Sequence, residues 1–272
     1  MSAVLDAATP SDWRRPEAAN TLYMQLADGV IVFELAPRFA PVVIGNIRKL
    51  VEQHYFDGLM IVRSQDNYVV QWGDPNAGTP HARTYGKAEN SIAPEFYRSR
   101  ESLAFTLLDS RDAYAVEVGF VDGFPAGRDA DRAWLAHCYG MLGVGRAEDI
   151  RSGSGAELYV VTGHAPRHLD RNVTLIGRVI YGIERLSTLP RGTGPLGFYD
   201  DESDYAEIRT MRFGDQLEAA LRLPLEVLRT DTETFRNLVK ARTHRLEEWF
   251  ADPAGRIGLC NVPLPVREAL AD

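Results

Sequence analysis

Runs of alternating apolar and polar residues recur along most of the chain. The first two, residues 21–27 and 30–35, flank Asp28-Gly29, a residue pair typical of a two-residue hairpin turn. Because alternation at a period of two puts the apolar side chains on one face, each run predicts a strand with one buried face. The same pattern predicts further strands at 59–64, 68–72, 103–107, 114–120, 140–145, 157–162, 173–179 and 206–213.

Helical periodicity is found in two regions. Pro41 suits a first helical turn, and apolar residues follow it at helical spacing up to Val51. Near the C-terminus, Thr230 or Asp231 can cap a helix whose apolar stripe we expect to pack against the strands. The stripe consists of Phe235, Leu238, Val239, Leu246, Trp249 and Phe250. Many short strands with few helices, and no regular βαβ alternation, favour an antiparallel barrel over a doubly wound sheet.

These patterns divide the chain into three parts. Residues 1–20 are rich in Ala, Pro, Asp and Ser without periodicity, and they predict an extended arm. Residues 21–213 hold the predicted strands, among which the stretch GFPAGRDAD at 123–131 is expected to be a loop. Residues 214–272 differ in composition and predict a helical extension.

Composition and charge narrow the class of protein. A chain of 272 residues with 45% apolar and 25% charged residues is typical of a globular protein with a sizeable core. Its net charge of −8 and its pI near 5.3 argue against binding nucleic acid through the overall field. No apolar run approaches the ~20 residues of a membrane span, so we expect no membrane insertion.

Two patterns that resemble cofactor sites fail on inspection. Gly143-Val144-Gly145 lacks the third glycine of a dinucleotide-binding turn. His164 and His168 have the i, i+4 spacing of a helical metal site, but Pro166 between them prevents that helix. We therefore expect neither a metal nor another cofactor.

A set of short motifs occurs in an order that carries more information than any one of them. They are Ala40-Pro41, Asn46, YFDG at 55–58, Arg63, YVVQWGDP at 68–75, GMLGVG at 140–145, AELYVVT at 156–162, Leu169-Asp170 and IGRVIYGIERL at 176–186. In this order and spacing, residues 21–213 resemble the cyclophilin peptidyl-prolyl isomerases. The resemblance implies a mainly β fold: an eight-stranded antiparallel β-barrel capped by helices, with a proline-binding groove on its outside. The helical extension predicted after residue 213 has no counterpart in the family.

The resemblance also implies a set of site residues. Arg63 falls on the family's catalytic arginine, and Gln71 falls on the glutamine beside it. The positions implied to bind substrate are Tyr68, Val69, Gly145, Arg146, Glu157, Tyr159, His168 and Leu169. Several residues depart from the family pattern and make the groove more polar or alter its shape. These are Val62 in place of His, Arg146 in place of Asn, Glu157 in place of Gln, His168 in place of Trp and Val173 in place of His.

The implied activity needs these residue types. An X-Pro amide rotates over a barrier of ~18 to 20 kcal/mol because twisting destroys its resonance. A catalyst needs an apolar pocket for the proline ring and a donor aimed at the nitrogen that becomes pyramidal in the twisted state. We therefore expect an isomerase that acts on proline-containing polypeptides and assists folding, with no nucleic-acid partner and as a monomer. The alternative is a groove that binds such segments as a chaperone with little or no turnover.

Location and the two cysteines are linked. Met1 without an apolar signal indicates the cytoplasm if it is the native start, whereas an Ala/Pro/Asp-rich arm is typical of a bacterial exported protein in its mature form. We expect the periplasm. The sequence by itself leaves Cys138 and Cys260 open as free thiols or a disulfide. An exported chain would oxidise them, so our hypothesis is that they are bonded to each other.

Overall fold

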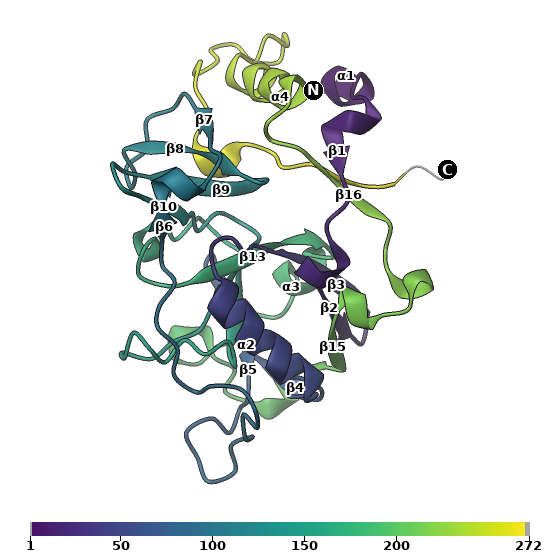
Figure 1. The fold of residues 1–272 in the computed structure, drawn as a ribbon, viewed down its shortest axis with the longest axis vertical. Helices are drawn as coiled ribbons and strands as arrows, with labels where there is room; N and C mark the ends of the chain where they lie inside the picture. The colour runs from purple at the N-terminus through teal and green to yellow at the C-terminus, as the bar shows by residue number, and fades with distance from the viewer. Residues whose placement is uncertain (1, 270–272) are drawn as a thin grey trace. The chain divides into compact units, whose positions relative to one another are not determined.

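The computed structural model describes residues 2–269 (Figure 1). The chain forms two compact units, neither of which is continuous in sequence. The barrel unit contains residues 17–97 and 136–222, and the accessory unit contains residues 1–16, 98–135 and 223–272. We describe each unit by itself.

A nine-stranded antiparallel sheet forms the barrel unit, in the order β14-β4-β5-β12-β11-β13-β3-β2-β15. Its strands are β2 Thr21–Leu26, β3 Gly29–Leu35, β4 Leu59–Ser64, β5 Val69–Gly73, β11 Met141–Val144, β12 Leu158–Val161, β13 Leu175–Tyr181, β14 Ala206–Ile208 and β15 Thr210–Phe213. All of them lie within or beside runs whose alternation predicted strands. The predicted mainly β fold is confirmed.

The sheet closes on itself at Arg209. The outermost strands of the sheet order, β14 and β15, are consecutive in sequence and are separated by this one residue. Ile208 pairs with Leu59 of β4, while the backbone N–H of Arg209 donates to the carbonyl of Gln25 in β2, at 2.9 Å. One chain segment therefore serves both ends of the sheet. Counted as a single strand broken at Arg209, it makes the eight strands that were expected.

The barrel core consists of the side chains that alternate inward. Trp72, Phe33 and Ile61 are fully buried, and helix α2 (Pro41–Glu52) adds the buried Ile47 and Leu50. Pro41 occupies the first turn of α2, where its missing N–H has no intrahelical partner to lose. A short helix, α3 (Glu184–Ser187), follows β13.

The accessory unit contains two sheets and two helices. Its five-stranded sheet has the order β6-β10-β9-β8-β7, and its three-stranded sheet has the order β1-β16-β17. The bounds are β1 Trp13–Arg14, β6 Arg98–Ser99, β7 Thr106–Leu108, β8 Glu117–Val121, β9 Phe124–Arg128, β10 Arg132–Leu135, β16 Leu225–Leu228, β17 Val266–Glu268, α1 Ser2–Asp6 and α4 Glu233–Thr243. The ring of Phe235 in α4 packs edge-on against Phe120 in β8, with 5.0 Å between ring centroids.

Three expectations about the accessory unit were wrong or incomplete. The stretch 123–131 is not a loop: it contains β9, which pairs with β8 on one side and β10 on the other. Its Gly and Pro residues concealed a strand that tertiary pairing stabilises. Residues 1–20 are not a featureless arm, since they include α1 and β1, and the predicted strand at 103–107 is only the shorter β7.

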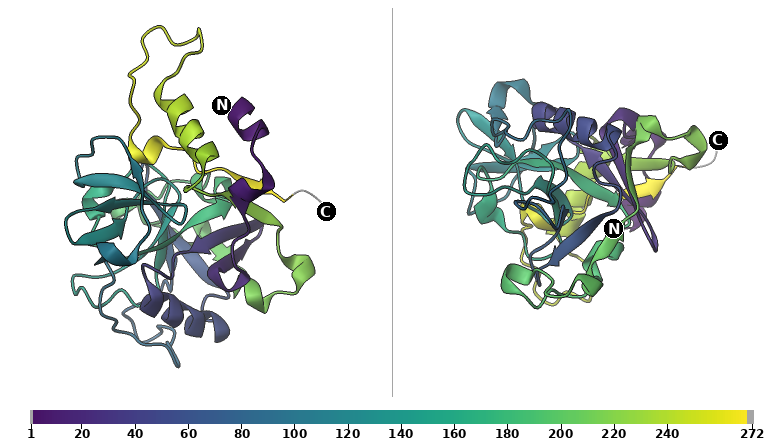
Figure 2. Two further views of the ribbon diagram at one scale, coloured as in Figure 1. Left: turned by 45° about the horizontal axis from the view of Figure 1, so that its top comes forward. Right: turned by 90° about the horizontal axis from the view of Figure 1, so that it is seen from below.

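The C-terminal segment is less helical than expected. It contains one α-helix, α4, together with strands β16 and β17. The helix is capped by Thr232, whose hydroxyl accepts from the backbone N–H of Phe235 at 3.2 Å, and it ends at Thr243. The chain then continues as a long loop (Figure 2). Leu246 and Trp249 lie in that loop and are 90% and 84% exposed, so the predicted buried stripe is limited to Phe235 and Leu238 within α4.

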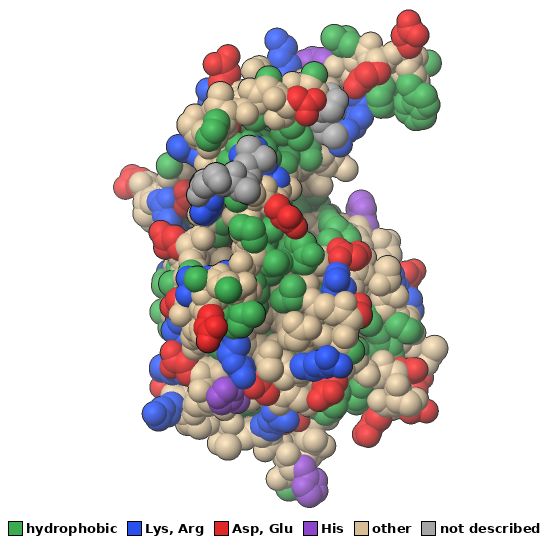
Figure 3. Space-filling model, turned by 90° about the vertical axis from the view of Figure 1, so that its right-hand side faces the viewer, with side chains coloured by type: hydrophobic (Ala, Val, Ile, Leu, Met, Phe, Trp, Pro, Cys, Tyr) green, Lys and Arg blue, Asp and Glu red, His purple; other side chains and the backbone are tan. Residues whose placement is uncertain are grey.

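Both cysteines are oxidised. Cys138 and Cys260 are each disulfide-bonded, as the hypothesis from the sequence requires, and neither is a free thiol. Among the described residues, no helix is both long enough and apolar enough to cross a membrane. On the face of the protein shown in Figure 3, acidic and basic side chains of the described residues are interspersed, and no broad basic area is seen.

Candidate functional site

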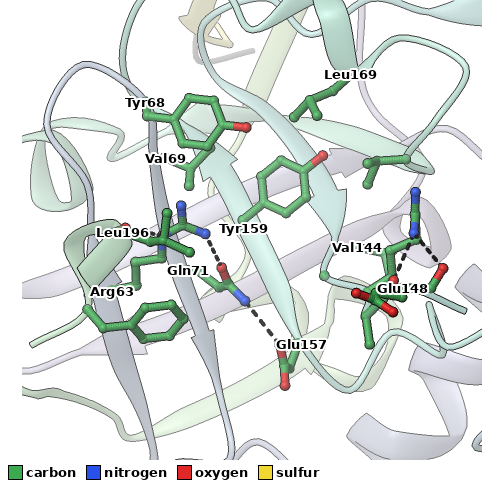
Figure 4. Close-up of a pocket in the computed structure, with 15 residues that line it drawn as sticks. Arg63, Tyr68, Val69, Gln71, Val144, Glu148, Glu157, Tyr159, Leu169 and Leu196 are labelled. Atoms are coloured by element: carbon green, nitrogen blue, oxygen red, sulfur yellow. Dashed lines mark hydrogen bonds between the residues drawn. The ribbon is translucent and has the colours of Figure 1, made fainter. Parts of the chain in front are cut away.

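Three neighbouring strands of the barrel bring the main site residues into one row. Arg63 in β4 is the register partner of Gln71 in β5, and Gln71 is the register partner of Tyr159 in β12. Residues directly opposite each other on adjacent strands point to the same face of a sheet. The three side chains therefore share one face, which Figure 4 shows from outside the barrel.

A β-bulge in β4 aims Arg63 at that face. Ile61 pairs with Trp72, and both are buried in the core, but the next pair is Arg63 with Gln71. The extra residue on the β4 side is Val62. In a regular strand Arg63 would share the inward face of Ile61, so the bulge is what turns its side chain outward.

Three acceptors hold the guanidinium of Arg63. Its Nη1–H donates to Oε1 of Gln71 at 3.0 Å, its Nε–H donates to the carbonyl of Leu196 at 2.7 Å, and its Nη2–H donates to Oε1 of Gln65. Burial lowers the pKa of Arg63 from its ordinary value, although an arginine stays charged at neutral pH. An arginine has five N–H groups, so two remain for a ligand while these three fix its orientation.

Glu157 fixes the other end of the Gln71 amide. Nε2 of Gln71 donates to Oε2 of Glu157 at 3.0 Å, so the amide oxygen must face Arg63. Burial raises the pKa of the Glu157 carboxyl, the hydrogen bond from Gln71 opposes that rise, and the nearby charge of Asp74 adds to it. The chain Glu157–Gln71–Arg63 is therefore a continuous hydrogen-bonded row along the groove floor.

A groove of about 660 Å³ lies over this row. Nine of the ten residues expected at the site line it: Arg63, Tyr68, Val69, Gln71, Gly145, Arg146, Glu157, Tyr159 and Leu169. The tenth, His168, does not line the groove, but its ring stacks parallel to that of Tyr68 with 6.4 Å between centroids. Val173, singled out as a departure from the family pattern, lines the groove as well.

The structure adds lining residues that were not expected: Val144, Ala147, Glu148, Leu196 and Phe198. Leu196 and Phe198 lie at the end of a Gly- and Pro-rich loop, where Phe198 forms a bridge with Arg63 and its ring lies 5.4 Å from the guanidinium carbon. Two apolar residues inside such a loop were the available signal, but nothing in the sequence shows that the loop returns to β4.

Arg146 is engaged by its own loop. Its Nε–H donates to the carbonyl of Asn172 at 3.0 Å, and its Nη1–H donates to the carbonyl of Ala147 at 2.8 Å. This arginine therefore shapes the rim of the groove by tethering backbone. Among residues 2–269, no group of three or more His, Cys, Asp or Glu side chains is arranged to hold a metal ion.

The arrangement combines a fixed cationic donor with an apolar wall. Val69, Tyr159 and Leu169 supply apolar surface to the groove that the Arg63 guanidinium also lines, and Leu169 lies beyond Tyr159 from Arg63 (Figure 4). Such a site can hold a small apolar ring and donate a hydrogen bond to a weak acceptor next to it, without forming or breaking a covalent bond.

Comparison with known proteins agrees with this geometry. Residues 21–206 match the family described as cyclophilin type peptidyl-prolyl cis-trans isomerase/CLD. The Homo sapiens protein named peptidyl-prolyl cis-trans isomerase-like 1 is 31% identical over 91 residues, which cover 33% of this chain and 52% of that protein. Its Mus musculus counterpart is 32% identical over the same length. The match thus spans about half the length of these curated relatives.

A solved structure matches the whole chain. The crystal structure of a cyclophilin from Hirschia baltica has a TM-score of 0.75 and 22% identity, and the alignment covers 100% of this chain and 98% of that one. At this identity the likeness is one of fold.

Proposed function

Because this chain belongs to the cyclophilin type peptidyl-prolyl cis-trans isomerase family, we propose that it catalyses rotation about X-Pro bonds at the groove around Arg63. The observation that carries the proposal is the fixed guanidinium of Arg63, with three of its N–H groups held by Gln71, Leu196 and Gln65. Its substrates are unfolded or exposed polypeptide segments that contain proline, and the reaction assists their folding.

The proposed mechanism is electrostatic. As the amide twists, its nitrogen loses resonance with the carbonyl and gains a lone pair that accepts a hydrogen bond. Arg63 donates to that nitrogen, and because its plane is already held, little reorganisation is needed when the barrier is reached. Gln71 acts by holding Arg63, while Val69, Tyr159 and Leu169 bind the proline ring through apolar contact.

Arg63→Ala tests the proposal. We expect kcat/KM for an Ala-Pro peptide to fall by ~10²-fold or more, the size seen when one preorganised donor is lost, with little change in peptide affinity. Isomerisation is measured by NMR exchange or a protease-coupled assay. The matched control is Arg256→Ala, an exposed arginine outside the barrel unit, which should keep full activity. Arg63→Lys should rescue only in part, because an ammonium cannot reproduce the planar fork.

A second function is favoured by the residues that depart from the family pattern. Arg146, Glu157, His168 and Val173 alter the groove, and a chaperone that binds proline segments with little turnover would tolerate such changes. The same experiment decides: wild type that binds the peptide without isomerising it above the spontaneous rate supports the binding function and contradicts the enzyme. Retention of full activity by Arg63→Ala would contradict the role of Arg63.

We further propose that the protein is a divergent bacterial member of the family, acts as a monomer and resides in the periplasm. The oxidised state of Cys138 and Cys260 supports an oxidising compartment. The location is checked by fractionating cells that carry the native gene. Sedimentation of the purified protein checks the oligomeric state.

A further inference from the structure

Directly behind the groove wall lies a buried cluster of polar side chains. Tyr159 in β12 is 6% exposed, His137 just before β11 is fully buried, and Asp170 and Arg167 are 2% and 5% exposed. All four belong to the barrel unit. Polar groups removed from water to this degree carry a large desolvation cost unless they are hydrogen-bonded, so their partners are informative.

The cluster is a single hydrogen-bonded chain. The hydroxyl of Tyr159 lies 2.8 Å from Nε2 of His137, and Nδ1 of His137 lies 2.9 Å from Oδ1 of Asp170. The backbone N–H of His137 donates to the same oxygen at 2.9 Å, and Nε–H of Arg167 donates to Oδ2 at 2.6 Å.

The protonation states of Asp170 and His137 determine which atom donates in each of these hydrogen bonds. Burial opposes ionisation of Asp170, but the hydrogen bond from His137 and the charge of Arg167 outweigh it and lower the pKa of Asp170. Burial also lowers the pKa of His137, so its imidazole is neutral at neutral pH. An ionised carboxylate only accepts, so Nδ1 of His137 carries the proton and Nε2 is an acceptor. The hydroxyl of Tyr159 therefore donates to His137.

The ring of Tyr159 is confined by its neighbours as well. It stacks nearly parallel to the His137 imidazole, with 6.3 Å between centroids and 10° between planes. On another side it lies against Gly143 of β11, its register partner, where an added Cβ would overlap Cζ and the hydroxyl oxygen of Tyr159. The phenol thus has one place to lie, with its hydroxyl committed to His137.

We propose that Asp170 and His137 are positioning residues that fix Tyr159 as the wall against which the substrate's proline ring packs. This inference rests on the proposed function of the same groove. A phenylalanine among apolar neighbours would supply a wall without burying four polar groups, so filling space does not account for the chain. Because His137 accepts the hydrogen bond from the Tyr159 hydroxyl, Tyr159 presents its apolar ring to the substrate in one orientation.

A double-mutant cycle tests the proposal. His137→Asn keeps a donor at the position of Nδ1 for Asp170 but is too short to reach Tyr159, and Tyr159→Phe removes the hydroxyl from the other side. We expect each change to lower kcat/KM by about fivefold, the size of one ordinary hydrogen bond, mainly through KM. The double variant should lose no more than either single one, because both break the same bond. His137→Gln, whose amide oxygen reaches the place of Nε2, should restore most of the loss.

Stability measured in parallel separates positioning from structure. One outcome is that the variants melt at a lower temperature and still have the kcat/KM of wild type when assayed well below that temperature. In that case the hydrogen bonds among these side chains only stabilise the fold, and the proposal is overturned. Additive losses in the double variant would also overturn it, because His137 would then act apart from Tyr159.

The cycle remains decisive if the protein proves to bind without turnover. The same four proteins are then compared by their dissociation constants for the Ala-Pro peptide, and a non-additive loss is again expected. Additive or absent effects on binding overturn the inference, while the Arg63→Ala assay decides the proposed function separately. Imidazole ¹⁵N NMR adds a readout independent of the peptide: His137 should be neutral with its proton on Nδ1, and any other state contradicts the direction of the chain.

Discussion

At the scale of single residues, Glu157 places a carboxyl group where burial disfavours its charge. Burial raises its pKa above the ordinary value, so between the unfolded and folded pKa the native state holds the proton more tightly. By linkage its effect on stability becomes less favourable as pH rises through that window. Glu157→Gln keeps an amide oxygen that can accept from Gln71, and it should be more stable than wild type at neutral pH. The two proteins should converge near pH 4, as denaturant unfolding at both pH values will show. A constant difference would contradict this assignment.

Gly143 provides a second test at this scale, since it leaves room for the ring of Tyr159. Gly143→Ala should displace that ring and lower kcat/KM by about ten- to a hundredfold, the size expected when a binding group moves by about 1 Å. The matched control is Gly45→Ala in α2, where an added Cβ meets nothing within 4 Å and alanine favours the helix. Wild-type activity in Gly143→Ala would show that the wall adapts.

Arg63 illustrates how much of the site was predictable. Its residue type and its spacing from Gln71 along the sequence matched a family pattern, so the pair was identified from the sequence. Its orientation was not, because the bulge at Val62 and the carbonyl of Leu196 depend on pairing across the sheet. Residue type is local information, whereas the direction of a side chain depends on distant partners.

At the scale of secondary-structure elements, Asp57 ties the segment before β4 to β15. Its carboxylate accepts from Nη1 and Nη2 of Arg212 at 2.8 and 2.7 Å, and from the backbone N–H of Met211 at 3.2 Å. Burial opposes ionisation of Asp57, but the bond from Arg212 outweighs it and lowers the pKa. The stabilisation is therefore present above the unfolded pKa and is lost as pH falls through the folded one.

Asp57→Asn should lower the free energy of unfolding by about 1.5 to 3 kcal/mol at neutral pH, because it removes the charge-assisted bonds. Chemical denaturation checks this value. The difference from wild type should shrink in acid, and Glu52→Gln, an exposed acid at the end of α2, should change little. A deficit that grows as pH falls would contradict the sign derived above.

Elements with clear alternation were identified well, and others were hidden by composition. The β2–β3 hairpin and the start of α2 at Pro41 were predicted from local patterns, but the turn itself lies one residue earlier than expected: Leu26 pairs with Gly29, so the two turn residues are Ala27 and Asp28. Strand β9 contains Pro125 and Gly127 and was missed, since it is stabilised by neighbours on both sides. Local sequence does not reveal how many partners a strand will have.

At the scale of the whole molecule, each compact unit is assembled from segments that are not consecutive in the sequence. The sequence divided the chain at residues 20 and 213, but residues 98–135 leave the barrel unit and form a sheet of their own. Hydrophobic patterning shows that a face is buried without showing which core it joins, so a discontinuous unit could not be predicted from it.

The disulfide gives a prediction at this scale. Reduction of Cys138 and Cys260 should lower the melting temperature. On the hypothesis that they are bonded to each other, the bond closes a loop of about 120 residues and contributes up to ~4 to 5 kcal/mol in the chain-entropy model. Thermal unfolding with and without a phosphine reductant measures the effect. The control is a variant with both cysteines changed to serine. With or without reductant, it should unfold at the melting temperature of the reduced wild-type protein. Two reactive thiols in the denatured, unreduced protein would contradict the oxidised state.

The closure of the barrel at Arg209 also bears on how the site comes into being. One edge of β4 pairs with the neighbouring strand β5, but its other edge pairs with Phe198, Tyr199 and β14. A chain synthesised from its N-terminus exposes Arg63 well over a hundred residues before those partners exist. Pairings so distant in sequence form slowly, because loop closure must precede the contacts that reward it. The arginine is therefore among the first site residues to be made, while Leu196, one of the three acceptors that fix it, is made more than a hundred residues later. We expect that a nascent chain lacks the proposed activity until the barrel closes.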